Sequence, residues 1–191
     1  MKFHFFAKLF RMRYIRRWGL MRSVSPESLA EHACITALLA QCLAMIRRDV
    51  FGREADPDKA AARALLHDAG EIITGDMPTP IKYHNEALRN AYALVEKESL
   101  ERLLKLLPAE MRGSYREAME SRDELVHAAD KLAAHIKCVE ELTAGNREFK
   151  LAASQTLTKL RDMNLPEVDY FLEHFMPGFS LTLDEQEEVR A

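Results

Sequence analysis

The stretch SPESLAEHACITALLAQCLAMIRRDVFG, residues 25–52, decides the fold class. Leu29, His32, Ile35, Leu39, Leu43 and Ile46 recur through it every three or four residues, and all but His32 are apolar. This spacing places them on one face of an α-helix. Ser25-Pro26-Glu27 has the residue types of a helix start, namely a capping hydroxyl, a first-turn proline and a first-turn acid. Phe51-Gly52 marks the end, so we expect one long buried helix with His32 on its apolar face.

The rest of the chain has the same helical periodicity and lacks the alternation typical of strands. The expected helices cover residues 3–11, 56–69, 79–107, 121–144, 147–163 and 166–176. Asp56-Pro57 repeats the capping residue and first-turn proline of a helix start, Ser121 and Glu124 form a capping-box pattern, and Gly145 has the position of a C-terminal cap. The sequence therefore predicts an all-α helical bundle in a single domain, 1–191, with about 180–191 as a frayed tail.

Composition excludes several classes of function. The chain has 191 residues, 48% of them hydrophobic and 30% charged, which suits one compact domain. A net charge of −3 disfavours broad electrostatic binding to polymeric nucleic acid. We expect no stretch to reach the ~20 apolar residues that a membrane span needs. Cys34, Cys42 and Cys138 fit neither a zinc pattern nor a disulfide framework, so they predict core thiols in a reducing cytoplasm.

The segment LLHDAGEIITGDMPTP, residues 65–80, collects ionisable and turn-forming residues at the end of a buried helix. His67 and Asp68 lie there side by side. Asp130 lies on the apolar side of LVHAADKLAAHI, residues 125–136, where an unpaired carboxylate would cost several kcal/mol. With His32, these residues offer two imidazoles and two carboxylates. That donor set suits one divalent transition metal ion, such as Mn²⁺, Co²⁺, Fe²⁺ or Zn²⁺.

Each candidate ligand also has an ordinary structural interpretation. His32 fits a buried histidine whose hydrogen bonds are made within the core. His67-Asp68 fits a pair of polar residues at the end of a helix, without a metal ion. Asp130 fits a carboxylate paired with Lys131 or an arginine. The combined pattern favours the metal site over these separate explanations. His127, three residues before Asp130 on the same helix, stays outside the expected ligand set.

The order His, then His-Asp, then Asp on separate helices resembles the HD-domain metal-dependent phosphohydrolases. Longer blocks resemble the bacterial 5′-deoxynucleotidase (YfbR-like) family within them: RRWGLMR (16–22), SLAEHA (28–33), HDAGEIITGDMPTPIKY (67–83), AADKLAAHIKCVEEL (128–142) with AGN, and DYFLEHFMPGF (169–179). The resemblance implies an all-helical homodimer that removes phosphate from deoxyribonucleoside 5′-monophosphates. It implies one metal ion per chain, Co²⁺, Mn²⁺ or similar, bound by His32, His67, Asp68 and Asp130.

The resemblance also implies the substrate contacts, which are Arg17, Trp18, His32, Asp76, Met77, Pro78 and Thr79. The Arg17 guanidinium has paired donors that suit a phosphate. Trp18 against C2′ of the sugar would leave a ribose 2′-hydroxyl without room or partner. Trp18 also fits ordinary core packing.

Two carboxylates complete the expected catalytic residues beside Arg17. Glu71, one helical turn beyond Asp68, could orient or deprotonate the attacking water. Asp76 could protonate the leaving 5′-oxygen, hold the nucleoside, or do both. Their ordinary interpretations are an exposed helix-end charge for Glu71 and turn chemistry for Asp76.

Two other functions use the same ligands. An HD-domain phosphodiesterase would act on cyclic or oligomeric nucleotides, and the lack of a further His cluster between Asp68 and Asp130 disfavours its two-metal version. A nucleotide-sensing module would bind phosphate without catalysis, and the presence of both Glu71 and Asp76 disfavours it.

Overall fold

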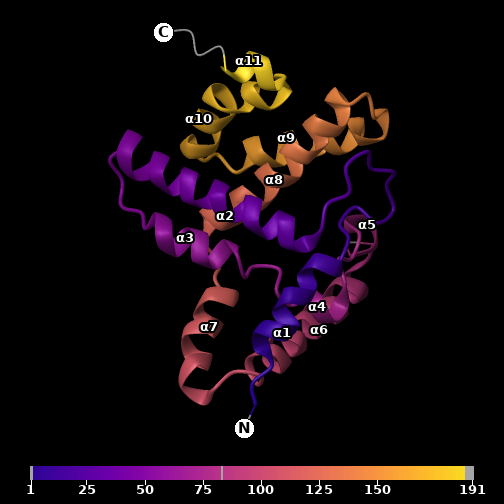
Figure 1. Cartoon of the computed structure of the whole chain (residues 1–191), viewed down its shortest axis with the longest axis vertical. Helices are drawn as coiled ribbons and strands as arrows, with labels where there is room; N and C mark the ends of the chain where they lie inside the picture. The colour runs from indigo at the N-terminus through magenta and orange to yellow at the C-terminus, as the bar shows by residue number, and fades with distance from the viewer. Residues whose placement is uncertain (1, 83, 188–191) are drawn as a thin grey trace.

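A computed structural model describes residues 2–82 and 84–187 (Figure 1). Its helices are α1 Phe5–Leu9, α2 Leu29–Met45, α3 Pro57–Ala64, α4 Glu71–Thr74, α5 Thr79–Lys82, α6 Glu86–Leu104, α7 Arg112–Met119, α8 Glu124–Thr143, α9 Lys150–Asp162, α10 Pro166–His174 and α11 Leu183–Glu187. A 3₁₀ turn, Phe10–Tyr14, extends α1, and a π turn, Ile46–Val50, extends α2. The described residues contain no β-strand, only an isolated bridge between Arg16 and Ser28. The all-α expectation is confirmed.

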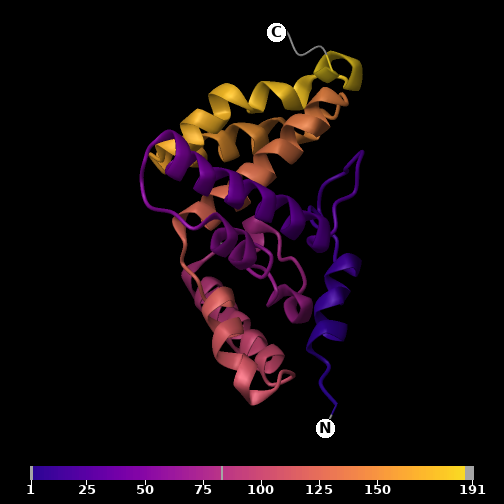
Figure 2. The ribbon, with the colours of Figure 1, turned by 60° about the vertical axis from the view of Figure 1, so that its left-hand side comes forward.

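Three helices form the centre of the molecule. α2 packs against both α3 and α8, and their shared core includes Leu43, Ala64 and Leu132, all fully buried. α9–α11 cover one end of this centre, while α6 and α7 extend from the other beside the N-terminal segment (Figures 1 and 2). The three central helices bring together segments that are distant along the chain.

The start of α2 differs from the sequence expectation. The helix is capped by Ser28, not Ser25: the Ser28 hydroxyl accepts a hydrogen bond from the Glu31 N–H, and the Glu31 carboxylate accepts one from the Ser28 N–H at 2.7 Å. The Ser25 N–H instead donates to Glu141 of α8. Glu27 therefore lies before the helix, in a segment that packs against the core.

Other expected boundaries also shift. α3 starts at the expected Asp56 cap but ends at Ala64, so His67 and Asp68 lie in turns rather than in the helix. Asp123, rather than Ser121, caps α8 by accepting from the Leu125 N–H at 3.0 Å. Gly145 follows α8 at φ 85°, in the left-handed region expected of a C-terminal glycine.

The expected helix over 79–107 is wrong as one element. α5 ends at Lys82, and α6 begins after Asn85, whose side chain accepts from the Leu88 N–H at 2.8 Å. α7 was not expected at all. Residues 183–187 form α11, so the expected frayed tail is wrong there, and residues 188–191 lie outside the described residues.

The segment Leu29–Val50 also corrects an expectation. These 22 residues are long and apolar enough to cross a membrane by length and composition, although no such stretch was expected from the sequence. More than half of the apolar window is buried against other helices, as in the core helix of a folded domain. The expectation for the thiols is wrong at one position, since Cys34 is exposed whereas Cys138 is buried.

Candidate active site

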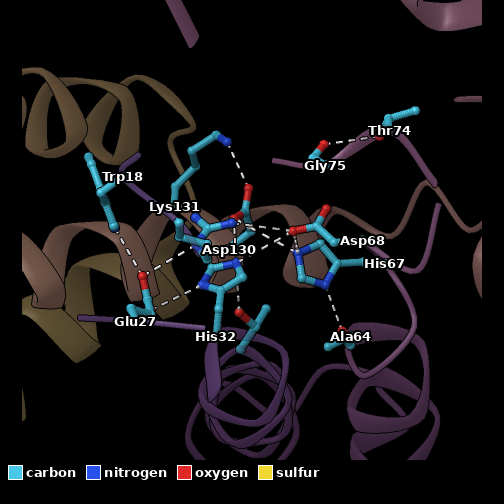
Figure 3. A network of polar contacts seen from close by, with 12 residues as sticks. Trp18, Glu27, His32, Ala64, His67, Asp68, Thr74, Gly75, Asp130 and Lys131 are labelled. Atoms are coloured by element: carbon cyan, nitrogen blue, oxygen red, sulfur yellow. Dashed lines mark hydrogen bonds and ion pairs between the residues drawn. The ribbon is translucent and has the colours of Figure 1, made fainter. Parts of the chain in front are cut away.

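The structure brings the four expected ligands to one point (Figure 3). His32 comes from the first turn of α2, His67 and Asp68 from the turn after α3, and Asp130 from α8. One donor atom from each lies within 4.8 Å of the others. Ligands held ~2.1 Å from one ion lie about 3–4 Å apart, so this separation fits a single metal ion.

His67 presents one ring nitrogen to the cluster. Its Nδ1 bonds to the carbonyl of Ala64 at 2.6 Å, which places a proton on Nδ1, so the lone pair of the neutral ring is on Nε2. That Nε2 is buried, lies 3.0 Å from Asp68 Oδ2, and has no hydrogen-bond partner among the described residues. Burial lowers the pKa of His67, but Asp68 and Asp130 outweigh burial and raise it to about 9. The charges of Asp68 and Asp130 therefore favour a positive charge at this point, which either a proton on His67 or a metal ion supplies.

His32 faces the same cluster from α2, with its ring centroid 5.4 Å from that of His67. Its Nε2 lies 3.1 Å from Asp130 Oδ1 and 3.7 Å from Asp68 Oδ2, and the ring is fully buried. The other oxygen of Asp130 accepts from Lys131 at 2.7 Å. The expected Lys131 pairing thus occurs together with the ligand cluster. Burial opposes ionisation of Asp130, but His32 and Lys131 hold its pKa well below the usual value.

Arg17 and Trp18 lie beside the cluster on the loop that precedes α2. Arg17 Nη1 is 3.5 Å from Asp68 Oδ2, and its Nε is 3.3 Å from Glu27 Oε2. The Trp18 indole N–H donates to the same Glu27 oxygen at 2.9 Å, and its ring packs against Phe149 with centroids 5.3 Å apart. Trp18 therefore has a packing partner as well as a position next to the site.

Glu27 is a site residue that the sequence did not indicate, because it has the position of an ordinary first-turn acid. The structure buries it between Arg17, Trp18 and His32. Burial alone would raise the pKa of Glu27, but the neighbouring His32 and Arg17 lower it. No local sequence signal distinguishes this acid, since its burial depends on the path of the loop.

Two further carboxylates line the same region. Glu71 begins α4, and its buried Oε2 has no hydrogen-bond partner among the described residues. Burial, followed by the charges of Asp68 and Asp76, raises the pKa of Glu71 to about 8. Burial also raises the pKa of Asp76, while Arg17 opposes the rise. The pKa of Glu71 therefore lies well above that of an exposed glutamate.

The loop after α4 carries the remaining expected substrate contacts. Gly75 has φ 75°, a left-handed conformation that glycine adopts without strain, and Asp76 follows it. Met77 and Pro78 are half-buried, and the side chain of Thr79 lies outside the described residues. Tyr92 of α6 donates its hydroxyl to Thr74 Oγ1 at 3.2 Å and to the Gly75 carbonyl at 3.4 Å.

Comparison with known proteins identifies the family. The sequence model of the YfbR-like 5′-deoxynucleotidases matches residues 4–179. A 5′-deoxynucleotidase of Photorhabdus laumondii is 43% identical over 188 residues, covering 95% of each chain. An HD-domain phosphohydrolase from Listeria innocua has a TM-score of 0.81 at 24% identity, covering 96% of this chain and 92% of that one.

A cyanophage S-2L HD phosphohydrolase bound to dA and one catalytic Zn²⁺ has a TM-score of 0.59 at 24% identity, covering 90% of this chain and 96% of that one. The structural likenesses show a shared HD-domain fold. The family expected from the sequence is confirmed by the family model and the close relative. The chain has the HD-domain fold, and it belongs to the YfbR-like 5′-deoxynucleotidase family.

Proposed function

We propose that this 5′-deoxynucleotidase hydrolyses deoxyribonucleoside 5′-monophosphates at one divalent transition metal ion and rejects ribonucleotides. The observation that carries the proposal is the convergence of four donor atoms, from His32, His67, Asp68 and Asp130, within 4.8 Å. The cyanophage phosphohydrolase, bound to dA and one Zn²⁺, supports both a nucleoside ligand and a single ion. Co²⁺, Mn²⁺ and Zn²⁺ all suit two imidazoles and two carboxylates.

A bound divalent ion supplies a water of lowered pKa and offsets charge on the phosphate. The protein fixes the geometry around it. The bond from His67 to Ala64 sets the ring tautomer. The guanidinium of Arg17, 3.5 Å from Asp68, binds phosphate oxygens with paired donors.

Glu71 and Asp76 are the candidates for proton transfer from the attacking water and to the leaving 5′-oxygen. The unpaired buried oxygen of Glu71 accepts a hydrogen bond from the attacking water and exchanges a proton with it. Asp76 protonates the leaving 5′-oxygen or holds the sugar. Their pH–rate profiles distinguish these roles, because loss of a general base removes the acidic limb and loss of a general acid removes the basic limb. Glu71→Gln and Asp76→Asn are the variants to compare.

Trp18 provides the selection for deoxyribose. Its indole is held from two sides, by Glu27 and by Phe149, so it forms a stiff wall. A ribose 2′-hydroxyl buried against such a wall without a hydrogen bond costs about 1–3 kcal/mol, which corresponds to about 5–150-fold in rate. Met77, Pro78 and the backbone of Thr79 contact the substrate from the loop after α4.

Phosphate release tests the proposal directly. The substrates are dAMP, dGMP, dCMP and dTMP against the four ribonucleotides, with cyclic nucleotides as further controls. Each is assayed with Mn²⁺, Co²⁺ or Zn²⁺ and again after treatment with EDTA. We expect preference for the deoxyribonucleotides and loss of activity on chelation. Equal turnover of AMP and dAMP would exclude the selectivity, and activity after complete chelation would exclude the metal.

The enzyme acts as a homodimer in the reducing cytoplasm. Three free thiols support the compartment. Two exposed aromatic rings of the N-terminal segment, Phe6 and Phe10, line an apolar groove of about 800 Å³ between α1, α2, α3 and α7. A second copy of the chain is the occupant we propose, because exposed apolar patches of this kind mark interaction surfaces.

Light scattering tests the dimer. Phe10→Glu should yield a monomer, whereas Leu151→Glu, an equally exposed apolar position on α9, should leave the mass of the wild type unchanged. A wild-type protein that is monomeric at micromolar concentration would refute the proposed dimer.

A further inference from the structure

Glu27 contacts two parts of the active site, the loop that carries Arg17 and Trp18 and the His32 side of the metal-ligand cluster. Its side chain is 9% exposed, and it faces donors on two different segments. One oxygen, Oε2, accepts from the Trp18 indole at 2.9 Å and from Arg17 Nε at 3.3 Å. The other, Oε1, lies 3.7 Å from His32 Nδ1. A carboxylate has enough lone pairs for three such donors.

We propose that Glu27 is a positioning residue that couples occupancy of the metal site to the orientation of the Arg17–Trp18 pair. One carboxylate oxygen orients the ring of His32, and the other holds both neighbouring side chains. This inference rests on the proposed function, in which His32 binds the ion and the Arg17–Trp18 pair contacts the substrate.

The link from Glu27 to His32 follows from the two ring nitrogens. His32 Nε2 faces Asp68 and Asp130, so Nε2 is the atom that would bind an ion. The proton must then be on Nδ1, which is buried and has no hydrogen-bond partner among the described residues. At 3.7 Å, Glu27 Oε1 is too far for a hydrogen bond, but a small rotation of either group brings it within reach.

The link from Glu27 to Trp18 follows from the backbone. Trp18 has φ 59°, a strained conformation that is uncommon for a bulky residue. It persists only where surrounding contacts hold it. The indole N–H bond to Glu27 and the ring contact with Phe149 are such contacts.

The backbone also fixes Glu27 relative to this loop. The Arg17 N–H donates to the Glu27 carbonyl at 3.0 Å, and the Leu29 N–H donates to the Ile15 carbonyl at 2.9 Å. These bonds hold the segments before and after the loop side by side. These bonds also fix the main chain of Glu27. A movement of the His32 ring would therefore be transmitted to Trp18 through the Glu27 carboxylate.

Trp18 is the one tryptophan of the chain, so intrinsic fluorescence reports on this residue directly. The metal-free protein is titrated with Zn²⁺, which is diamagnetic, while tryptophan emission and quenching by acrylamide are followed. We expect the wild-type emission to change as Zn²⁺ binds. A competing chelator gives the Zn²⁺ affinity independently of any activity.

Glu27→Gln is the variant that tests the coupling, because it keeps the shape and replaces one acceptor with a donor. We expect Zn²⁺ affinity to fall about 10–100-fold, as for other groups that orient a metal-binding histidine. We also expect greater quenching of Trp18 by acrylamide and no emission change on Zn²⁺ binding. Glu140→Gln, an exposed residue of α8 that lines the same 460 Å³ cavity as Glu27, is the matched control and should behave as wild type.

A Glu27→Gln protein with wild-type Zn²⁺ affinity and a wild-type emission response would overturn the inference. If this variant does not fold, the wild-type titration alone decides: Zn²⁺ binding without any change in Trp18 emission or quenching overturns it. Neither measurement needs a substrate. Failure of the proposed function, seen as equal turnover of AMP and dAMP, is therefore distinguishable from failure of the coupling.

Discussion

Glu141→Gln tests whether a buried carboxylate of α8 anchors the loop that carries Arg17 and Trp18. Glu141 is 2% exposed. It accepts hydrogen bonds from the backbone N–H groups of Val24 and Ser25 at 2.8 and 3.1 Å and from Asn146 at 2.7 Å. Lys137 donates to the same carboxylate and to the Ser25 carbonyl. The substitution leaves this cluster without its negative charge.

The pKa of Glu141 gives the magnitude. Burial alone would raise it, but the bonds from Lys137, Val24, Asn146 and Ser25 lower it from 4.5 to about 2. At about 1.4 kcal/mol for each unit of pKa, the folded state gains about 3 kcal/mol from the ionised group. Because the folded-state pKa is the lower one, this stabilisation is complete above pH 4.5 and is lost as the pH falls toward 2.

Urea unfolding followed by circular dichroism at pH 7, 5.5, 4 and 3 measures the effect. We expect Glu141→Gln to be about 3 kcal/mol less stable than wild type at pH 7, with the difference shrinking below pH 4.5. Glu98→Gln is the control, because Glu98 is an exposed partner of Arg102 at 3.8 Å and such pairs contribute little. A difference below ~1 kcal/mol at pH 7, or one that does not shrink in acid, would refute the reasoning.

Four further substitutions probe the site and the core. Glu71→Gln should lower kcat by about 10²–10⁴-fold with unchanged metal content, and an unchanged kcat would exclude proton transfer by this residue. Asp130→Asn should lower the metal content of purified protein, measured by elemental analysis, and full occupancy would exclude Asp130 as a ligand. Tyr92→Phe removes the hydrogen bond to the Gly75 carbonyl and should raise KM several-fold with a near-normal melting temperature; a wild-type KM would show that the loop needs no such anchor. Leu132→Ala, at a fully buried position, should cost about 2–5 kcal/mol in urea unfolding, and a cost below ~1 kcal/mol would mean that the core closes around the gap.

Local interactions explain what could be predicted. Helix periodicity depends on residues three and four apart, so the sequence was sufficient to predict α2, α8 and α9 and the all-α class. The Asp56 cap of α3 and Gly145 after α8 act within one turn and were predicted correctly. The unusual residue types at His32, His67-Asp68 and Asp130 indicated a shared site because each would be costly alone in an apolar setting.

Packing between distant segments decided the features that the sequence did not predict, namely the cap of α2 and the burial of two glutamates. Ser25 has the residue type of a cap, but its N–H donates to Glu141, and the cap of α2 moves to Ser28. Glu27 and Glu141 differ little in sequence from exposed glutamates. Their burial depends on a loop that folds back over residues more than a hundred positions away, and no local pattern encodes that path. The sequence by itself determined the all-α class and the candidate metal-binding residue types, whereas only the tertiary structure decided that Glu27 and Glu141 are buried, because the free energy of a buried charge depends on its neighbours in space.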